Sequence, residues 1–314
     1  MPYRVSMALS AFLLCLFAGT SVAASPAAPS DTLPTPAPAD TSLLWWPNGP
    51  LSNPWTPVAA LLLPTRDLLV ADKAQNRLYL IHGRDTAPVR LPEPSPAPVE
   101  WTALSGAPGL AIYALDGPGG KVHQFDFKGN YLGVAVDFDA VALANGLGRV
   151  DARGLAVDRS GRAVVTDRQN DRVLLFGPGW SFLGVLGETG SGLGAWRRPT
   201  MAAASEKGSF LVVDEGNRRV VLLDAVGSVK TARSTKEVPQ GVSALGPELF
   251  AIALDDRVDV VNANLELVAS YPVPAGPRCG GASYTTPAVT GTEDLILVGE
   301  GCSGRLLELR IRGD

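Results

Sequence analysis

The sequence predicts an all-β protein built from repeated, short-stranded units. Its 314 residues include 34 glycines and 26 prolines, a combined share well above the roughly 12% of average proteins. Turn residues therefore interrupt the chain too often for long helices. Apolar runs of five to seven residues, rich in Val, Leu and Ile, end at Gly, Asp or Pro, as strands buried on both faces do. With 46% hydrophobic residues, the chain can bury a large core.

A repeat of about 45 residues organises these strands. Its clearest copy spans residues 154–176, and a second spans residues 201–223. Each copy places an acid at the end of an apolar run, and we align six of them: Asp72, Asp116, Asp167, Asp214, Asp255 and Glu300. Their spacings of 41 to 51 residues suit four short strands with turns. The sequence therefore predicts one domain, a six-bladed β-propeller with four antiparallel strands per blade.

The repeat resembles the NHL repeat. The resemblance rests on Gly-Leu-Ala-Val-Asp, Val-Val-Thr-Asp and Gln-Asn-Asp-Arg-Val within residues 154–176, and on the connection from Gly187 to Pro199. It is specific in the third and fourth units, recognisable in the first and only periodic elsewhere, over residues 58–312. The resemblance implies a six-bladed β-propeller, which the strand count predicts independently.

Two segments precede the predicted propeller. Residues 1–24 have the features of a signal peptide: a single charge at Arg4, an apolar run, and small residues up to Ala24. We expect cleavage before Ser25, with no membrane span left in the mature chain, and export to the periplasm or the medium. Residues 25–41 are rich in Pro and Ala, so we expect a disordered tether. Residues 42–314 are the expected propeller domain.

The ends of the chain are expected to share one blade. The last unit supplies only three strands, near residues 282–289, 294–299 and 305–312, which would leave an unpaired edge. We expect a strand near residues 42–46 to pair beside residues 306–311 and close the ring. Trp45 and Trp46 in this segment have an alternative role as a ligand platform.

Two cysteines remain after removal of the signal peptide, Cys279 and Cys302. Cys279 precedes the innermost strand of the sixth blade, and Cys302 lies between its second and third strands. Both connections emerge on the same face of a blade, and exported proteins keep disulfides. We therefore expect a structural disulfide between them.

The charge and histidine content argue against several functions. The net charge of −4 argues against a nucleic-acid partner, since such binding needs a basic face. Some six-bladed relatives are enzymes that use zinc held by three histidines, but this chain has only His82 and His123. Calcium-dependent relatives gather several acids at the starts of the innermost strands, where this chain is expected to place only Glu100 and Asp151. We predict no cofactor and no metal site, with a channel calcium left open.

The recurring acids and arginines are expected to serve the scaffold. Asp72, Asp167 and Asp214 each precede an arginine by five residues: Arg77, Arg172 and Arg219. Because the same pair recurs at the same point of each unit, we expect every acid to cap its loop and pair with its arginine around the ring.

One rim carries side chains that the repeat does not explain. Loops entering the innermost strands share a face with the loops between second and third strands, and we expect a ligand-binding rim there, formed by Arg153, Arg197, Arg198, Arg278, Trp101, Trp196 and Gln240. Arginines and aromatics suit carboxylates or sugars. The alternative is that Arg197 and Arg198 are solvated and Trp196 packs between blades. We predict a monomeric, non-enzymatic binding or scaffolding propeller for a protein, peptide or glycan. A metal-dependent hydrolase or lyase of the propeller class is the alternative.

Overall fold

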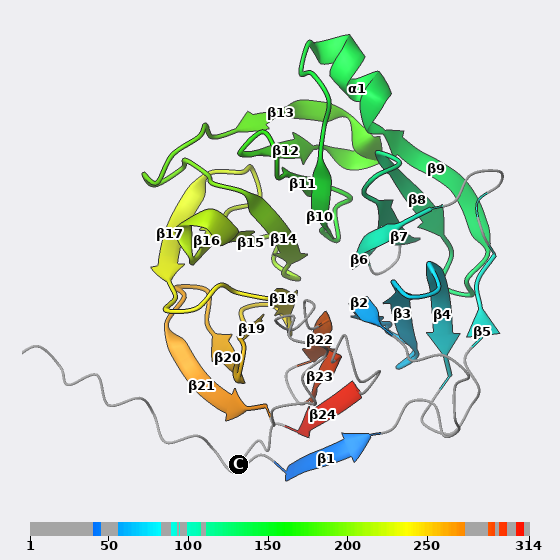
Figure 1. Ribbon diagram of the computed structural model, residues 1–314, viewed down its shortest axis with the longest axis vertical. Coiled ribbons are helices and arrows are strands. Elements are labelled where there is room, and N and C mark those ends of the chain that lie inside the picture. Colours follow the sequence, from blue (N-terminus) through cyan, green and yellow to red (C-terminus); the bar gives the residue numbers. More distant parts are fainter. Residues whose placement is uncertain are drawn as a thin grey trace, which may run out of the picture. The chain divides into compact units, whose positions relative to one another are not determined.

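The computed structural model describes residues 40–44, 56–82, 89–92, 94, 99–107, 111–273, 288–292, 295–299 and 306–310. Within these residues the chain forms a β-propeller, with four antiparallel strands in each blade. The sheets are arranged around a central axis (Figure 1), and residues of the innermost strands line a channel along it. None of the helices in the described residues is long and apolar enough to cross a membrane.

The strands of the described residues form six sheets, each of which runs from an innermost strand to an outermost one. The first three sheets contain β2 (Pro57–Leu62), β3 (Leu68–Asp72), β4 (Arg77–Ile81) and β5 (Val89–Arg90); β6 (Trp101–Ala107), β7 (Ala111–Asp116), β8 (Lys121–Phe125) and β9 (Tyr131–Asp137); and β10 (Ala152–Val157), β11 (Ala163–Asp167), β12 (Arg172–Phe176) and β13 (Phe182–Leu186). The other three contain β14 (Pro199–Ala204), β15 (Phe210–Asp214), β16 (Arg219–Leu223) and β17 (Val229–Ser234); β18 (Gly241–Ala244), β19 (Phe250–Ala253), β20 (Arg257–Val261) and β21 (Leu267–Pro272); and β22 (Ala288–Thr292), β23 (Leu295–Gly299), β24 (Leu306–Arg310) and β1 (Asp40–Leu44).

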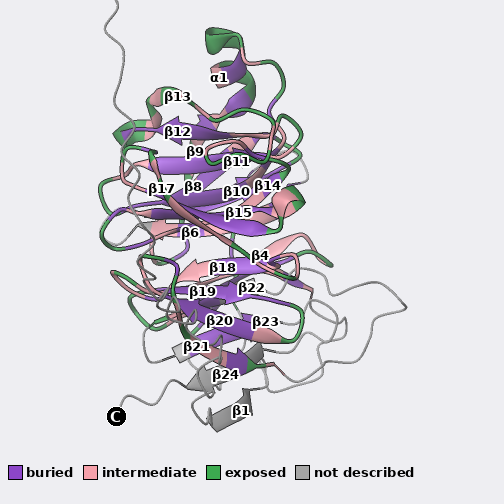
Figure 2. Ribbon diagram, turned by 90° about the vertical axis from the view of Figure 1, so that its left-hand side faces the viewer, coloured by how far each residue is buried: buried purple, intermediate pink, exposed green. Residues whose placement is uncertain are grey.

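The core lies between neighbouring sheets. Strands β3, β11, β15 and β16 are buried along their whole length, because each sheet is covered on both faces, as the apolar runs of the sequence predict. One apolar cluster joins the sheets of β6–β9 and β10–β13, and includes Leu115 and Phe176. Another joins the sheets of β14–β17 and β18–β21, and includes Leu222 and Phe250. Figure 2 shows the buried strands at the centre and exposed residues in the loops.

Hydrogen bonds between innermost strands reinforce this packing. The Ser105 hydroxyl of β6 accepts the Val157 N–H of β10 at 2.8 Å, and the Thr290 hydroxyl of β22 accepts the Leu62 N–H of β2 at 2.9 Å. The innermost strands contact one another in the order β2, β6, β10, β14, β18, β22 and again β2. These bonds fix the relative position of neighbouring blades.

Strand β1 pairs antiparallel with β24, with Leu43 opposite Leu307. It lies at residues 40–44 instead of the expected 42–46, so the last two residues of the predicted tether, Asp40 and Thr41, belong to a strand. Pairing with β24 supplies partners for their backbone groups, which composition alone does not reveal. Trp45 and Trp46 lie outside the described residues, as do residues 1–39.

The described residues include one α-helix that the turn-rich sequence did not lead us to expect. Helix α1 (Phe138–Asn145) lies between β9 and β10. The Asp137 side chain caps its start by accepting the Asp139 N–H at 3.0 Å, and Gly146 ends it in a left-handed conformation. Phe138 is buried against Phe176. The short connections η1 (Pro178–Trp180) and η2 (Glu215–Asn217) are 3-10 turns.

Candidate functional site

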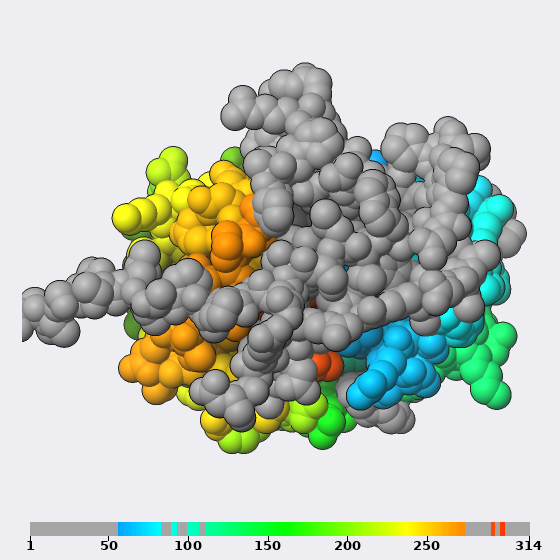
Figure 3. All heavy atoms as spheres, turned by 90° about the horizontal axis from the view of Figure 1, so that it is seen from below, coloured from blue at the N-terminus to red at the C-terminus, as the bar shows by residue number. Residues whose placement is uncertain are grey.

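The two ends of the channel differ in chemistry. We call the end where the innermost strands begin the entry face, and the end where they finish the exit face. Thr56, Arg153 and Thr200 mark the entry face, since each lies at the start of an innermost strand or just before it. The turns after Leu62, Val157 and Ala204 mark the exit face. Figure 3 shows the molecule edge-on, with the surface of β2–β4 in blue and that of β18–β21 in yellow and orange.

Arginines gather on the entry face between the sheets of β10–β13 and β14–β17. Glu215 joins two of them: Arg198 approaches it with an N–O distance of 3.0 Å, and Arg168 with one of 3.5 Å. The Arg198 backbone N–H also donates to the Asp171 carboxylate at 2.7 Å. The Arg197 side chain is exposed and packs over Gly216, where an added Cβ would lie 2.6 Å from its Cγ. The Arg153 Nε lies 3.1 Å from the Asp151 Oδ1.

This sector is positive on a chain that is negative as a whole. The loops of these two sheets on the entry face hold eight arginines and six acidic residues. These loops are residues 149–153, 167–172, 187–198 and 214–219. Within the described part of the chain, Arg149, Arg197 and Arg218 take part in no ion pair. The predicted rim did not include Arg149, Arg168 and Arg218. They also lie in loops that enter an innermost strand or join a second strand to a third, which is the rule that placed Arg153 on the rim.

The other predicted rim residues divide into three groups. Trp101 and Trp196 are buried, with 2% and 1% exposure, because both pack in the apolar core. Neither ring is available to a ligand in this structure, which corrects that part of the prediction. Gln240 lies at the entry face, where its backbone N–H donates to the Ala253 carbonyl at 2.8 Å. Arg278 lies outside the described residues.

The recurring acids hold the entry loops. Asp72, Asp116, Asp167 and Asp214 accept the backbone N–H of Thr56, Glu100, Asp151 and Arg197 respectively, at 2.7, 3.1, 2.9 and 2.8 Å. Asp167 and Asp214 also accept the Nε–H of Arg172 and Arg219, both at 2.7 Å. The expected scaffold role is confirmed at these two pairs.

Asp255 does not belong to this series, contrary to the repeat alignment. It is exposed, and strand β19 ends before it at Ala253. The Ala253 carbonyl takes the place of the acid by accepting the Gln240 N–H. Arg257 instead pairs with Glu237, Asp256 and Asp259. The sixth acid, Glu300, lies outside the described residues.

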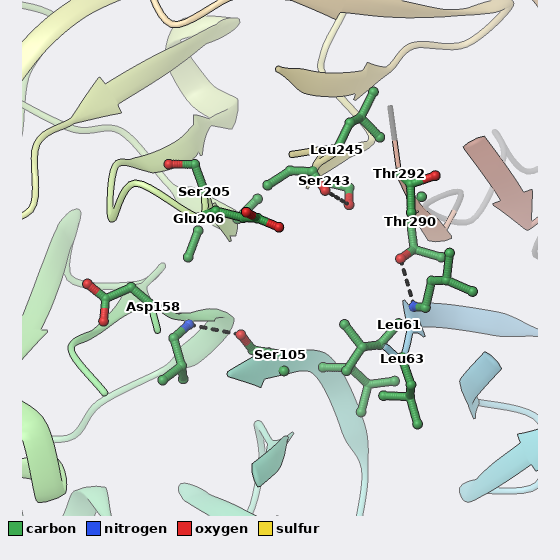
Figure 4. A pocket seen from close by; sticks show the side chains of 18 of the residues that line it. Leu61, Leu63, Ser105, Asp158, Ser205, Glu206, Ser243, Leu245, Thr290 and Thr292 are labelled. Carbon is green, nitrogen blue, oxygen red and sulfur yellow. Dashed lines mark hydrogen bonds between the residues drawn. The ribbon is translucent and has the colours of Figure 1, made fainter. Parts of the chain in front are cut away.

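The exit face contains a cavity of about 340 Å³ that the sequence did not lead us to expect. It lies among the ends of the innermost strands (Figure 4). Apolar side chains line much of it, among them Leu61, Leu104, Leu155, Val242 and Leu245. The space is left by small residues in the second halves of the innermost strands: Ala60, Gly106, Ala202, Ala204, Ala244 and Gly291.

The two histidines do not form a site with each other. The His123 Nδ1 lies 3.1 Å from the Tyr131 hydroxyl, and the ring packs edge-on against Trp101. Burial lowers the pKa of His123, so its ring is neutral at pH 7. The His82 Nδ1 lies 3.2 Å from the Asp67 Oδ1. No group of three His, Cys, Asp or Glu side chains suited to a metal ion occurs in the residues that the structure describes.

No protein family model matches the sequence, and no curated protein does. Solved structures with the same fold include a virginiamycin B lyase from Staphylococcus aureus, with 11% identity over 87% of this chain and 99% of that one, and a TM-score of 0.57. A gluconolactonase from Xanthomonas campestris has 14% identity, covers 82% of this chain and 86% of its own, and gives a TM-score of 0.59.

A third similar structure comes from a nidogen/laminin complex, with 14% identity, coverage of 70% of this chain and 81% of that one, and a TM-score of 0.54. These neighbours include both enzymes and a binding protein, and at such low identity they share the fold alone. The NHL resemblance stays a prediction, while the β-propeller fold is confirmed.

Proposed function

We propose that this protein is a non-enzymatic binding or scaffolding propeller. Its ligand is an acidic segment of a protein, peptide or glycan, bound at the entry face between the sheets of β10–β13 and β14–β17. The observation that carries the proposal is the exposed Arg197 beside Arg198 and Arg168, which converge on the single carboxylate of Glu215. Arginine presents a planar set of donors that matches carboxylates.

The energetics favour a surface that binds weakly but selectively. Exposed ion pairs contribute little to folding, so the excess arginines of this sector are not explained by stability. An incoming carboxylate replaces water around Arg197 and competes for Arg198, whose side chain is 53% exposed. Several such contacts steer an acidic partner to the face, and salt weakens them.

Binding to polyglutamate and to polygalacturonate tests the proposal. The variant Arg197→Gln/Arg198→Gln keeps the side-chain length and removes two charges, so we expect at least tenfold weaker binding than that of the unchanged protein. The binding of the unchanged protein should fall as NaCl rises. Isothermal titration calorimetry measures both effects.

The matched control is Arg159→Gln/Lys207→Gln. It removes the same charge from exposed residues of the exit face, and we expect it to bind as the unchanged protein does. Equal loss in both variants would mean that net charge alone attracts the polyanion. No loss in the Arg197/Arg198 variant would remove the entry face as the site.

The alternative function is a metal-dependent hydrolase or lyase of the propeller class. The support for this alternative is that a lyase and a gluconolactonase have similar structures. The binding function is favoured because the described carboxylates nearest the channel entrance are engaged elsewhere. Asp151 lies beside Arg153, and the acids of the repeat cap the entry loops.

We further propose a ring of six blades closed by strand β1. The pairing of β1 with β24 and the contact between β22 and β2 support it. Such a blade joins the two ends of the chain, so every sheet has a neighbour on each side. Closure of this kind predicts that a chain without β1 is less stable and tends to self-associate.

We also propose that the chain is exported as a monomer, with cleavage before Ser25 and a disulfide between Cys279 and Cys302. Both cysteines lie outside the described residues. The intact mass of the secreted protein tests both points: we expect a chain that begins at Ser25 and is lighter by two hydrogens than its reduced form. A chain that retains residues 1–24, or two free thiols that react with iodoacetamide before reduction, would contradict the respective proposal.

A further inference from the structure

The cavity on the exit face has the size of a small-ligand site. Its volume of about 340 Å³ falls in the range of 300–1,000 Å³ of ligand pockets. A cavity of roughly 150 Å³ lined by aliphatic and aromatic side chains accommodates benzene. The exit-face cavity is about twice as large, which suits two fused aromatic rings.

Several polar side chains of the cavity wall are already engaged with the protein. The Ser105 and Thr290 hydroxyls accept backbone N–H groups of the neighbouring blades, and the Ser205 hydroxyl accepts the Ser209 N–H at 3.1 Å. Asp158 is 1% exposed, and its carboxylate accepts from the Ser160 and Arg162 N–H groups and pairs with the Arg162 guanidinium. The charged groups of the wall are paired, Asp158 with Arg162 and Glu206 with Arg159, so a charged ligand meets no unpaired counter-charge there.

One carboxylate is directed at the opening. In Figure 4 the Glu206 side chain extends toward the space between the strands. It pairs with Arg159 at 3.3 Å, and both side chains are about half exposed. Its second oxygen stays able to accept a hydrogen bond from a ligand, while a ligand carboxylate at the same place would be repelled.

We propose that this cavity binds an uncharged aromatic ligand of two fused rings, with a hydrogen-bond donor directed at Glu206. The site is independent of the acidic partner proposed for the entry face, because it lies at the other end of the channel. Burial of the rings against Leu61, Leu104 and Leu155 supplies the affinity, and a wall whose charges are already paired supplies selectivity.

Indole is a suitable probe, since it has two fused rings and one N–H donor. Ligand-observed NMR and calorimetry on the full chain should detect its binding, and indole should raise the melting temperature. Indole-3-acetate, which adds a carboxylate to the same rings, should bind at least tenfold more weakly. A Gly-Trp-Gly peptide distinguishes the source of the ring: tighter binding than indole assigns the site to a protein side chain, and weaker binding assigns it to a free ligand.

The variant Ala204→Leu fills the cavity and should weaken indole binding at least tenfold. Ala140→Leu is the matched control, because it makes the same change at an exposed position of helix α1, and it should bind indole normally. Glu206→Gln, which keeps an acceptor and removes the charge, should restore binding of indole-3-acetate toward that of indole. Absence of indole binding by the unchanged protein, or equal binding by a folded Ala204→Leu variant, would overturn the proposal.

Discussion

Replacing Arg219 by alanine is expected to cost the protein about 3–5 kcal/mol of its free energy of unfolding, the range for breaking a buried ion pair from one side. The Arg219 guanidinium donates to the Asp214 carboxylate at 2.7 Å and to the carbonyls of Ser191, Gly192 and Ala195 at 3.0, 2.9 and 2.6 Å. Its side chain is 10% exposed, and that of Asp214 is not exposed at all.

The expected loss of stability in Arg219→Ala has two causes. Asp214 would keep its negative charge in the core with only the Arg197 N–H and the Asn217 amide to stabilise it. The connection between β13 and β14 would also lose the donors that hold three of its carbonyls. Since Arg197 follows that connection directly, we expect the entry face to become more mobile in the same variant.

Urea denaturation measures the effect, and two further variants interpret it. Arg219→Lys keeps a charge but cannot reach the carbonyls and Asp214 together, so we expect an intermediate loss. Arg168→Ala removes a surface arginine from its pair with Glu215 and should cost less than about 1 kcal/mol. An Arg219→Ala variant as stable as Arg168→Ala would show that water replaces the guanidinium without penalty.

Removal of strand β1 is the second change with a large expected effect. A chain that starts at Trp45 lacks β1, whereas a chain that starts at Pro34 keeps it. The missing strand pairs five residues with β24. If several backbone hydrogen bonds of about 0.5–1.5 kcal/mol each are lost, the shorter chain should be less stable by roughly 3 kcal/mol or more.

The exposed edge of β24 should also cause self-association, because unpaired strand edges pair with other chains. Calorimetry and size-exclusion chromatography compare the two chains, and a peptide of residues 34–44 added to the shorter one should restore part of its stability. If both chains melted at the same temperature as monomers, β1 would not close the ring, and the blade would be complete without it.

Local pattern was enough to predict the blades. The apolar runs became β3, β11, β15 and the strands beside them, because a run flanked by turn residues and covered on both faces has few alternatives to a buried strand. The Asp167–Arg172 and Asp214–Arg219 pairs were also predictable, since a contact within one hairpin depends on near neighbours in the sequence. Even the pairing partner of β1 followed from a count of strands per unit.

Sequence pattern was enough for the fold class, the antiparallel four-stranded unit and the buried acid–arginine pairs, all of which rest on contacts within a blade. Only the packing of neighbouring sheets puts Trp101 and Trp196 in the core, lets Ala253 replace an acid in the fifth sheet, and brings small residues from five different strands together to leave a cavity at the exit face. Those features depend on how neighbouring sheets meet. A hydrophobic pattern records which residues avoid water, but it does not record which residues of another blade will cover them.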